Sequence, residues 1–189
     1  MSPTVLVVDD EEAVADRIGR VLRDEYDVRT AYSGQSALNT FDADVDVVLL
    51  DRRLSDLSGA EVLERLRARD VRCQVAMVTA VSPDFDVLEM PFDDYVTKPL
   101  PDEEIRELVA RLLTRSQLDR NLQEYASLVS KRVALERERG PAQLAGSEEF
   151  RVMTDRIARL RAEIDDTIAQ MDDAETFAVL ETREGQRAD

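Results

Sequence analysis

The chain has 189 residues but no histidine, no tryptophan, one cysteine and only two lysines. The lone Cys73 excludes a disulfide within the chain, and no cysteine or histidine cluster offers a zinc site. No apolar stretch approaches the roughly 18 residues needed to cross a bilayer. The first strand-like run also lacks a preceding signal-peptide pattern. We therefore expect a cytoplasmic protein that does not associate with membranes.

The charge of the chain is strongly one-sided. Asp and Glu number 41 against 25 Lys and Arg, which gives a formal net charge of −16. Phosphate backbones attract basic surfaces, so general affinity for nucleic acid is not expected. The only lysines are Lys98 and Lys131. An acidic, lysine-poor composition suggests adaptation to high salt, which screens self-repulsion; an acidic mesophilic protein is the alternative.

One buried strand is predicted at Val47–Leu50, which is followed by Asp51 and the charged loop 52–59. Four consecutive apolar residues between polar boundaries are typical of a strand covered on both faces, as in the centre of a parallel α/β sheet. Ligands of open α/β sheets bind at the carboxyl ends of the strands, where the strand order reverses. Asp51 is therefore predicted to be the reactive centre.

Strands and helices alternate over the first 114 residues. Apolar periodicity predicts further strands at residues 4–8, 28–31, 75–79 and 95–97. It predicts helices around residues 14–22, 37–41, 59–66 and 84–90, with Ser33-Gly34 as a turn. This alternation indicates an α/β domain, a doubly wound five-stranded parallel sheet with helices on both faces and right-handed crossovers.

The second half of the chain is predicted to be helical. Neither glycine nor proline occurs from Asp102 to Arg139, and one helix of that length would extend about 57 Å, far beyond a five-stranded domain. Gly140-Pro141 ends this helix, residues 143–146 form a connector, and Ser147 is the predicted N-cap of the next helix. The chain should therefore continue from the fifth helix of the α/β domain into an all-α hairpin.

A heptad seam follows Ser147. Six apolar residues and one threonine recur in steps of three and four, as in coiled coils: Phe150, Met153, Ile157, Leu160, Ile164, Thr167 and Met171. We predict a helical hairpin or coiled coil over residues 115–180 and a polar tail over 181–189. The seam favours a homodimer, and the sequence leaves open whether it closes within one chain or between two.

Polar side chains at the ends of the predicted strands should meet at one edge of the sheet. Asp9 and Asp10 end the first strand, Asp51 the third and Thr79 the fourth, and Lys98 follows the fifth. Two or three carboxylates in water make a hard oxygen site that suits Mg²⁺. Asp51 is then placed as a nucleophile that forms an acyl phosphate. Lys98 and the Thr79 hydroxyl can bind phosphoryl oxygens.

Four sequence blocks resemble the receiver domain of two-component response regulators. They are VLVVDDEE at 5–12, VVLLDRRLSDLSG at 47–59, MVTA at 77–80 and YVTKP at 95–99. The resemblance covers residues 4–114, within a predicted domain of residues 1–114. It implies a flavodoxin-like fold in which a histidine kinase phosphorylates Asp51. Such a protein catalyses its own phosphorylation and dephosphorylation and is not a stand-alone enzyme. A phosphatase of the haloacid-dehalogenase type would need a second aspartate where Arg53 stands.

The resemblance also implies a set of metal ligands. Asp10 and Asp51 would bind Mg²⁺ directly, Asp9 would assist through a water molecule, and the backbone carbonyl of Arg53 would supply a further ligand. Arg53 is larger than the side chains common at that position of the family. Since the implied ligand is the carbonyl, metal binding should survive this difference, whereas the rate of phosphate hydrolysis is put in doubt.

The resemblance further implies a conformational switch. Thr79 and Tyr95 would move together when phosphate arrives, and the peptide bond between Lys98 and Pro99 would be cis, a proline-dependent feature. The segment between Thr79 and Lys98 is shorter than in most receivers. The fourth helix is therefore expected to be short or irregular.

Residues after 115 resemble the HalX domain found behind receivers of halophilic archaea, on SLVSKRVALE at 127–136 and SEEFRVMTDRIARLRAEID at 147–165. Two outputs follow. Transcriptional regulation through DNA suits the family, although no helix-turn-helix pattern is visible and glutamates dilute the basic strip. That strip consists of Lys131, Arg132, Arg137 and Arg139. A dimerisation or protein-docking module is the alternative, favoured by the seam and the acidic surface.

Overall fold

The computed structural model describes residues 2–69, 73–83, 85, 87 and 90–185, without the side chains of residues 170 and 172–185. The chain forms two compact units, residues 1–116 and residues 117–189. Within the described ranges, no helix combines the length and apolar character that a membrane crossing requires.

The first unit is built on a five-stranded parallel sheet in the order β2-β1-β3-β4-β5. Its strands are β1 (Thr4–Val8), β2 (Asp27–Ala31), β3 (Val45–Leu50), β4 (Gln74–Thr79) and β5 (Asp94–Thr97). This order confirms the predicted flavodoxin-like doubly wound fold. The order reverses between β1 and β3, so the carboxyl ends of these two strands border the crevice in which such folds bind ligands.

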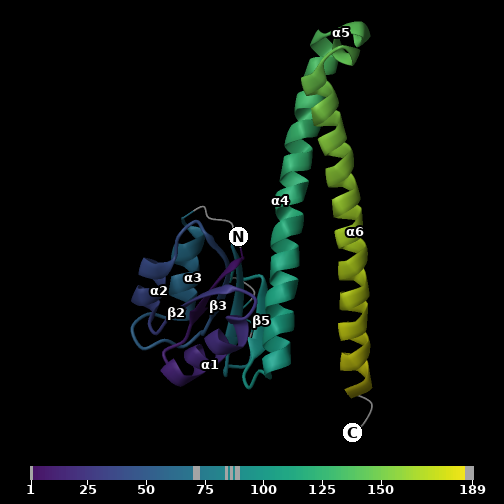
Figure 1. Cartoon of the computed structure of the whole chain (residues 1–189). Helices are drawn as coiled ribbons and strands as arrows, with labels where there is room; N and C mark the ends of the chain where they lie inside the picture. The colour runs from purple at the N-terminus through teal and green to yellow at the C-terminus, as the bar shows by residue number, and fades with distance from the viewer. Residues whose placement is uncertain (1, 70–72, 84, 86, 88–89, 186–189) are drawn as a thin grey trace. The chain divides into compact units, whose positions relative to one another are not determined.

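Alternate residues of each strand enter two separate cores, because successive side chains of a strand point to opposite faces. Helices α2 (Gly34–Thr40) and α3 (Gly59–Arg67) cover the face that carries Leu6 and Val48. Helix α1 (Glu12–Leu22) and the first part of α4 (Asp102–Glu138) cover the face that carries Val7 and Leu49. Figure 1 shows the sheet enclosed by these helices. Both faces are buried, which explains the continuous apolar run of β3.

Two local predictions are wrong, and one falls outside the described residues. Ser33-Gly34 is no separate turn, because the Ser33 hydroxyl accepts a hydrogen bond from the Ser36 N–H at 3.1 Å and Gly34 begins α2. The predicted connector after Gly140 contains a short helix, α5 (Pro141–Ala145), since proline is well suited to a first helical turn. The helix expected at 84–90 lies largely on residues that the structure does not describe.

The second unit is a helical hairpin made of the end of α4, α5 and α6 (Glu148–Gly185). Ile157, Leu160 and Ile164 of the predicted seam are buried. Contacts between α4 and α6 cross the hairpin. Nε and Nη2 of Arg156 donate to the two carboxylate oxygens of Glu124, at 2.8 and 2.7 Å. The middle of the seam therefore packs within the chain, whereas Phe150, Met153, Thr167 and Met171 stay half-buried.

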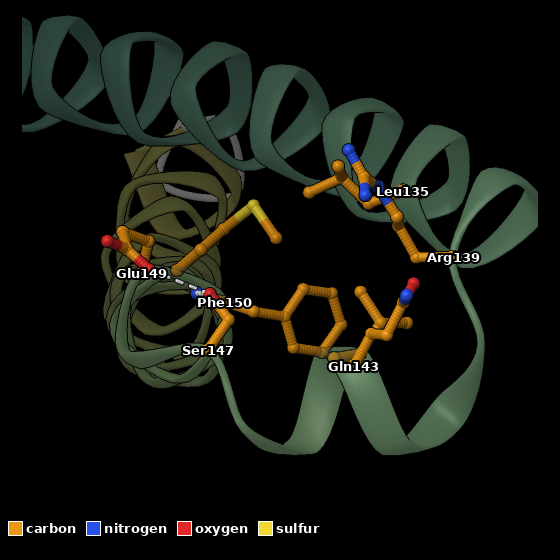
Figure 2. Close-up of a pocket in the computed structure, with 8 residues that line it drawn as sticks. Leu135, Arg139, Gln143, Ser147, Glu149 and Phe150 are labelled. Carbon is orange, nitrogen blue, oxygen red and sulfur yellow. Dashed lines mark hydrogen bonds between the residues drawn. The ribbon is translucent and has the colours of Figure 1, made fainter.

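The turn of the hairpin holds a half-open cavity of about 410 Å³. Figure 2 shows the Phe150 ring lying between the end of α4 and α5, and the N–H of Phe150 donates to the Ser147 hydroxyl at 3.2 Å. Ser147 is thus the N-cap of α6, as predicted. The cavity is lined by Leu135, Arg139, Gln143, Leu144, Ser147, Glu149, Phe150 and Met153.

Candidate functional site

The acidic cluster lies where the strand order reverses. Asp9 follows β1 and Asp51 follows β3, and these two strands are neighbours in the sheet. Both carboxylates are buried, with 2% and 7% of the residue exposed, whereas Asp10 is exposed. One carboxylate oxygen from each of the three residues lies within 4.8 Å of the others. The structure thus gathers the three aspartates at one point.

Lys98 reaches this cluster from the end of β5, the strand at one edge of the sheet. Its ammonium donates to Oδ2 of Asp9 at 2.6 Å and to Oδ2 of Asp51 at 2.7 Å. The backbone N–H of Lys98 donates to the carbonyl of Thr79 at 2.8 Å, and the Lys98–Pro99 peptide bond is cis. The residue is therefore held by the end of β4 while its side chain spans to β1 and β3.

Burial and charge act against each other in this cluster. Burial raises the pKa of Asp9 above its ordinary value, although hydrogen bonding and attraction from Lys98 oppose the rise. For Lys98 burial favours the neutral amine, but its hydrogen bonds to Asp51 and Asp9 outweigh this and raise the pKa. One ammonium faces three carboxylates, so two negative charges remain in excess when all are ionised. Such a cluster favours a divalent cation.

The backbone around Asp51 is tightly packed. The N–H of Asp51 donates to the carbonyl of Val8 at 2.9 Å, and the N–H of Arg53 donates to Oδ1 of Asp51 at 3.1 Å. A Cβ atom added to Gly59 would lie 2.3 Å from the carbonyl oxygen of Asp51, a distance that real Cβ atoms essentially never show. Only glycine fits there, so the start of α3 rests directly on the backbone of Asp51.

Thr79 and Tyr95 meet at Val81 rather than at the carboxylates. The buried Thr79 hydroxyl accepts a long hydrogen bond of 3.4 Å from the N–H of Val81. The Tyr95 hydroxyl donates to the carbonyl of Val81 at 2.7 Å, and its ring lies 5.5 Å from that of Phe92. The loop after β4 is thus tied to both proposed switch residues.

Two residues that sequence reasoning missed support the site from outside. A guanidinium nitrogen of Arg17 donates to the carbonyl of Leu100 at 2.7 Å and to the carboxylate of Asp102 at 2.6 Å, which ties α1 to the segment after Lys98. Asp56 binds the start of α2 from the loop after Asp51. No periodic or local pattern in the sequence predicts such contacts between distant segments.

Comparison with family models gives two matches. The response regulator receiver domain matches residues 5–110, and the HalX domain matches residues 114–181. Together they follow the order of the two units in the chain.

Three curated relatives are similar to parts of the chain. A Haloferax volcanii protein, named as a candidate transcriptional regulator, is 45% identical over 84% of the chain, which spans 27% of that relative. The sensory transduction protein RegX3 of Mycobacterium tuberculosis is 44% identical over 58% of the chain and 48% of its own length. The regulatory protein PhoP of Bacillus subtilis, named for alkaline phosphatase synthesis, is 37% identical over 62% and 51%. The chain thus spans about half or less of these relatives.

Two solved structures resemble the first unit. The response regulator DrrB of Thermotoga maritima is 34% identical with a TM-score of 0.56, covering 61% of this chain and 54% of DrrB. The response regulator TrrA of the same organism, solved in complex with Mg(2+)-BeF, is 32% identical with a TM-score of 0.53, covering 58% of this chain and 98% of TrrA.

Proposed function

Since the chain belongs to the response regulator receiver family and carries a HalX domain behind its receiver, we propose that it accepts phosphate in a two-component phosphorelay. The observation that carries the proposal is the Asp51 carboxylate, buried at the end of β3 beside Asp9 and 2.7 Å from the Lys98 ammonium. Residues 1–114 would be the phosphoacceptor domain, 115–180 the output or dimerisation domain, and 181–189 a tail.

The proposed reaction is transfer of a phosphoryl group from a phosphohistidine of a sensor kinase. An oxygen of Asp51 attacks phosphorus, a P–O bond forms, the P–N bond breaks, and the leaving imidazole takes up a proton. The product is an acyl phosphate on Asp51. The Lys98 ammonium then exchanges its carboxylate partner for a phosphoryl oxygen, and the Thr79 hydroxyl binds another.

The donor set fits Mg²⁺, which prefers oxygen ligands and takes only one or two carboxylates directly. Asp10 and Asp51 would hold the ion directly, Asp9 through water, and Arg53 through its backbone carbonyl. When bound, Mg²⁺ supplies positive charge that offsets the phosphoryl oxygens. The exposed position of Asp10 leaves room for the water molecules that this ion retains.

Signalling would follow a population shift, in which the phosphoryl group stabilises one of two conformations. The contacts of Thr79 and Tyr95 with Val81 support a movement of the loop after β4.

The output would be transcriptional regulation, as the name of the Haloferax relative suggests. Docking of a protein or a second copy is the alternative. It is favoured because Arg132 of the basic strip lies 3.7 Å from Glu136, so an acidic side chain offsets part of the positive charge that DNA binding would need. A DNA mobility assay over a salt series separates the two, because phosphate contacts weaken steeply with salt.

The phosphoacceptor is tested by incubating the protein with Mg²⁺ and labelled acetyl phosphate. Asp51→Asn should abolish acid-stable, base-labile labelling, because the amide cannot form the acyl phosphate. Asp44→Asn is the matched control, since Asp44 is exposed and precedes the same strand at its opposite end. Full labelling of the Asp51 variant, or none of the unmodified protein, would refute the proposal.

A further inference from the structure

The loop between β3 and α3 is closed at its stem. The N–H of Gly59 donates to the carbonyl of Arg52 at 2.8 Å, and Arg53 pairs with Ser58 in an isolated antiparallel bridge. The Ser58 hydroxyl and the Glu61 side chain form a capping box at the start of α3. The stem therefore leaves the tip of the loop, residues 54–57, to be fixed by other contacts.

Asp56 fixes this tip to a different element. Its Oδ1 accepts from the N–H of Gly34 at 2.8 Å and of Leu57 at 2.9 Å, and its Oδ2 accepts from the N–H of Gln35 at 2.9 Å. Gly34 and Gln35 are the first residues of α2, where N–H groups have no partner within the helix. One carboxylate thus joins the loop after the phosphoacceptor to a helix more than 20 residues earlier.

Packing supports the same connection. A Cβ atom added to Gly34 would lie 2.8 Å from Leu57 Cβ and 2.8 Å from a Val62 methyl carbon, so the tip of the loop is pressed against the start of α2. The hydrogen bond from Gln35, followed by those from Gly34 and Leu57, lowers the pKa of Asp56. The acceptor is therefore ionised at neutral pH, where charge strengthens all three bonds.

We propose that Asp56 is a positioning residue for the divalent cation. It holds the loop tip so that the carbonyl of Arg53, three residues earlier, keeps a fixed place beside Asp51. The inference rests on the proposed function, because that function assigns the Arg53 carbonyl to Mg²⁺. Without Asp56 the loop tip keeps only the apolar packing of Leu54 and Leu57, and no hydrogen bond joins it to α2. The carbonyl must then be ordered when the ion binds. Asp56 would thus affect cation affinity while leaving the acyl-phosphate chemistry to Asp51 and Lys98.

The test is calorimetric titration of the full chain with Mg²⁺. Asp56→Ala should weaken binding by roughly 10-fold, the lower end of what loss of an outer-shell partner costs. Asp56→Asn keeps one acceptor oxygen and should weaken it less. The matched control is Asp42→Asn, which removes an equal charge from an aspartate that accepts the Asp44 N–H and pairs with Arg29. Its affinity should stay within about twofold of the unmodified protein, because it lies outside the loop.

Hydrogen exchange of the loop amides supplies a second measurement. Exchange over residues 52–58 should rise in both Asp56 variants and stay unchanged in Asp42→Asn. If Asp56→Ala fails to fold, Asp56→Asn decides the question by the same two measurements. Equal Mg²⁺ affinity in the unmodified protein and the folded Asp56 variants would overturn this inference alone. Absence of Mg²⁺ binding to the unmodified protein would overturn the proposed function as well.

Discussion

The receiver unit and the helical hairpin use polar side chains in opposite ways. In the receiver, Asp9, Asp51 and Lys98 are held together in a largely buried cluster. In the hairpin, polar pairs such as Glu124 with Arg156 bridge two helices while staying partly exposed. Buried charges cost stability unless they are well paired, and like charges cost more. The receiver therefore holds an unfavourable excess of negative charge at Asp9, Asp10 and Asp51, and no such cluster occurs in the described part of the hairpin.

The apolar cores explain why the receiver can do so. Two cores, one on each face of the sheet, hold most of its strand side chains. Among the described residues of the hairpin, by contrast, only Ile157, Leu160 and Ile164 are buried apolar side chains. A narrow seam specifies little by itself, so cross-helix polar contacts must help to decide which residues face each other.

The largest expected effect compares two leucines that are both fully buried on helices, Leu22 of α1 and Leu160 of α6. Substitution of either by alanine should cost about 2–5 kcal/mol of unfolding free energy. Leu22→Ala should lower the thermal transition of the receiver without unfolding it, because many other core side chains remain. Leu160→Ala should open the hairpin, because it removes one of the few residues that close the seam.

Hydrogen exchange measured separately over residues 1–116 and 117–171 distinguishes these outcomes. Each leucine serves as the control for the other, since side chain and burial are the same. Unchanged protection of the hairpin in Leu160→Ala would show that its polar contacts suffice, and the contrast between the two units would fail.

A somewhat smaller effect is expected at Arg67, which cross-links the receiver at the opposite end of the sheet from Asp51. Its guanidinium donates to the carbonyls of Pro91 and Cys73, at 2.9 and 2.7 Å, and to the carboxylate of Asp93 at 2.6 Å. Arg67→Met should lower the free energy of unfolding by about 2–3 kcal/mol, because loss of the charged donor leaves the acceptors of its hydrogen bonds without this partner. Urea unfolding measures the loss, and Arg65→Met, at an exposed position of the same helix, should change little.

A loss at Arg67 no larger than at Arg65 would mean that polar cross-links do not stabilise the receiver. The polar groups of the receiver would then serve chemistry alone. If Arg67→Met does lower the stability of the receiver, polar groups at that end of the sheet stabilise the fold, as they do in the hairpin. The difference between the two units is then confined to the end of the sheet that carries the aspartates.

Periodic and local features were predictable from sequence. The apolar run before Asp51 and the seam around Leu160 depend on residues a few positions apart, so their burial follows from spacing alone. Parallel strands also bring their carboxyl ends to one edge, which is why Asp51 and Lys98 were expected to meet. Contacts that join distant segments have no such pattern. The bonds of Asp56 to α2 and of Arg17 to Leu100 depend on how loops dock after folding.

The smallest of these effects concerns Asn121, which is buried in the hairpin with 5% exposed. Its amide donates to the Glu163 carboxylate across the hairpin at 3.3 Å and accepts from the side chain of Gln117 at 2.8 Å. A buried asparagine in a coiled-coil seam fixes register and association at a cost in stability. Asn121→Leu should therefore raise the stability of the hairpin by about 1 kcal/mol while admitting other registers or association states.

Thermal unfolding and sedimentation equilibrium measure the two parts of that prediction. Gln123→Leu is the matched control, because it adds the same side chain to an exposed position of α4. If Asn121→Leu is more stable yet still sediments as a single species, the apolar residues of the seam fix the register of the two helices without Asn121. If Asn121→Leu lowers stability, its bond to Glu163 outweighs the burial of the amide. The polar contacts of the hairpin would then stabilise it as well as specify it, which is where the two units would come to resemble each other.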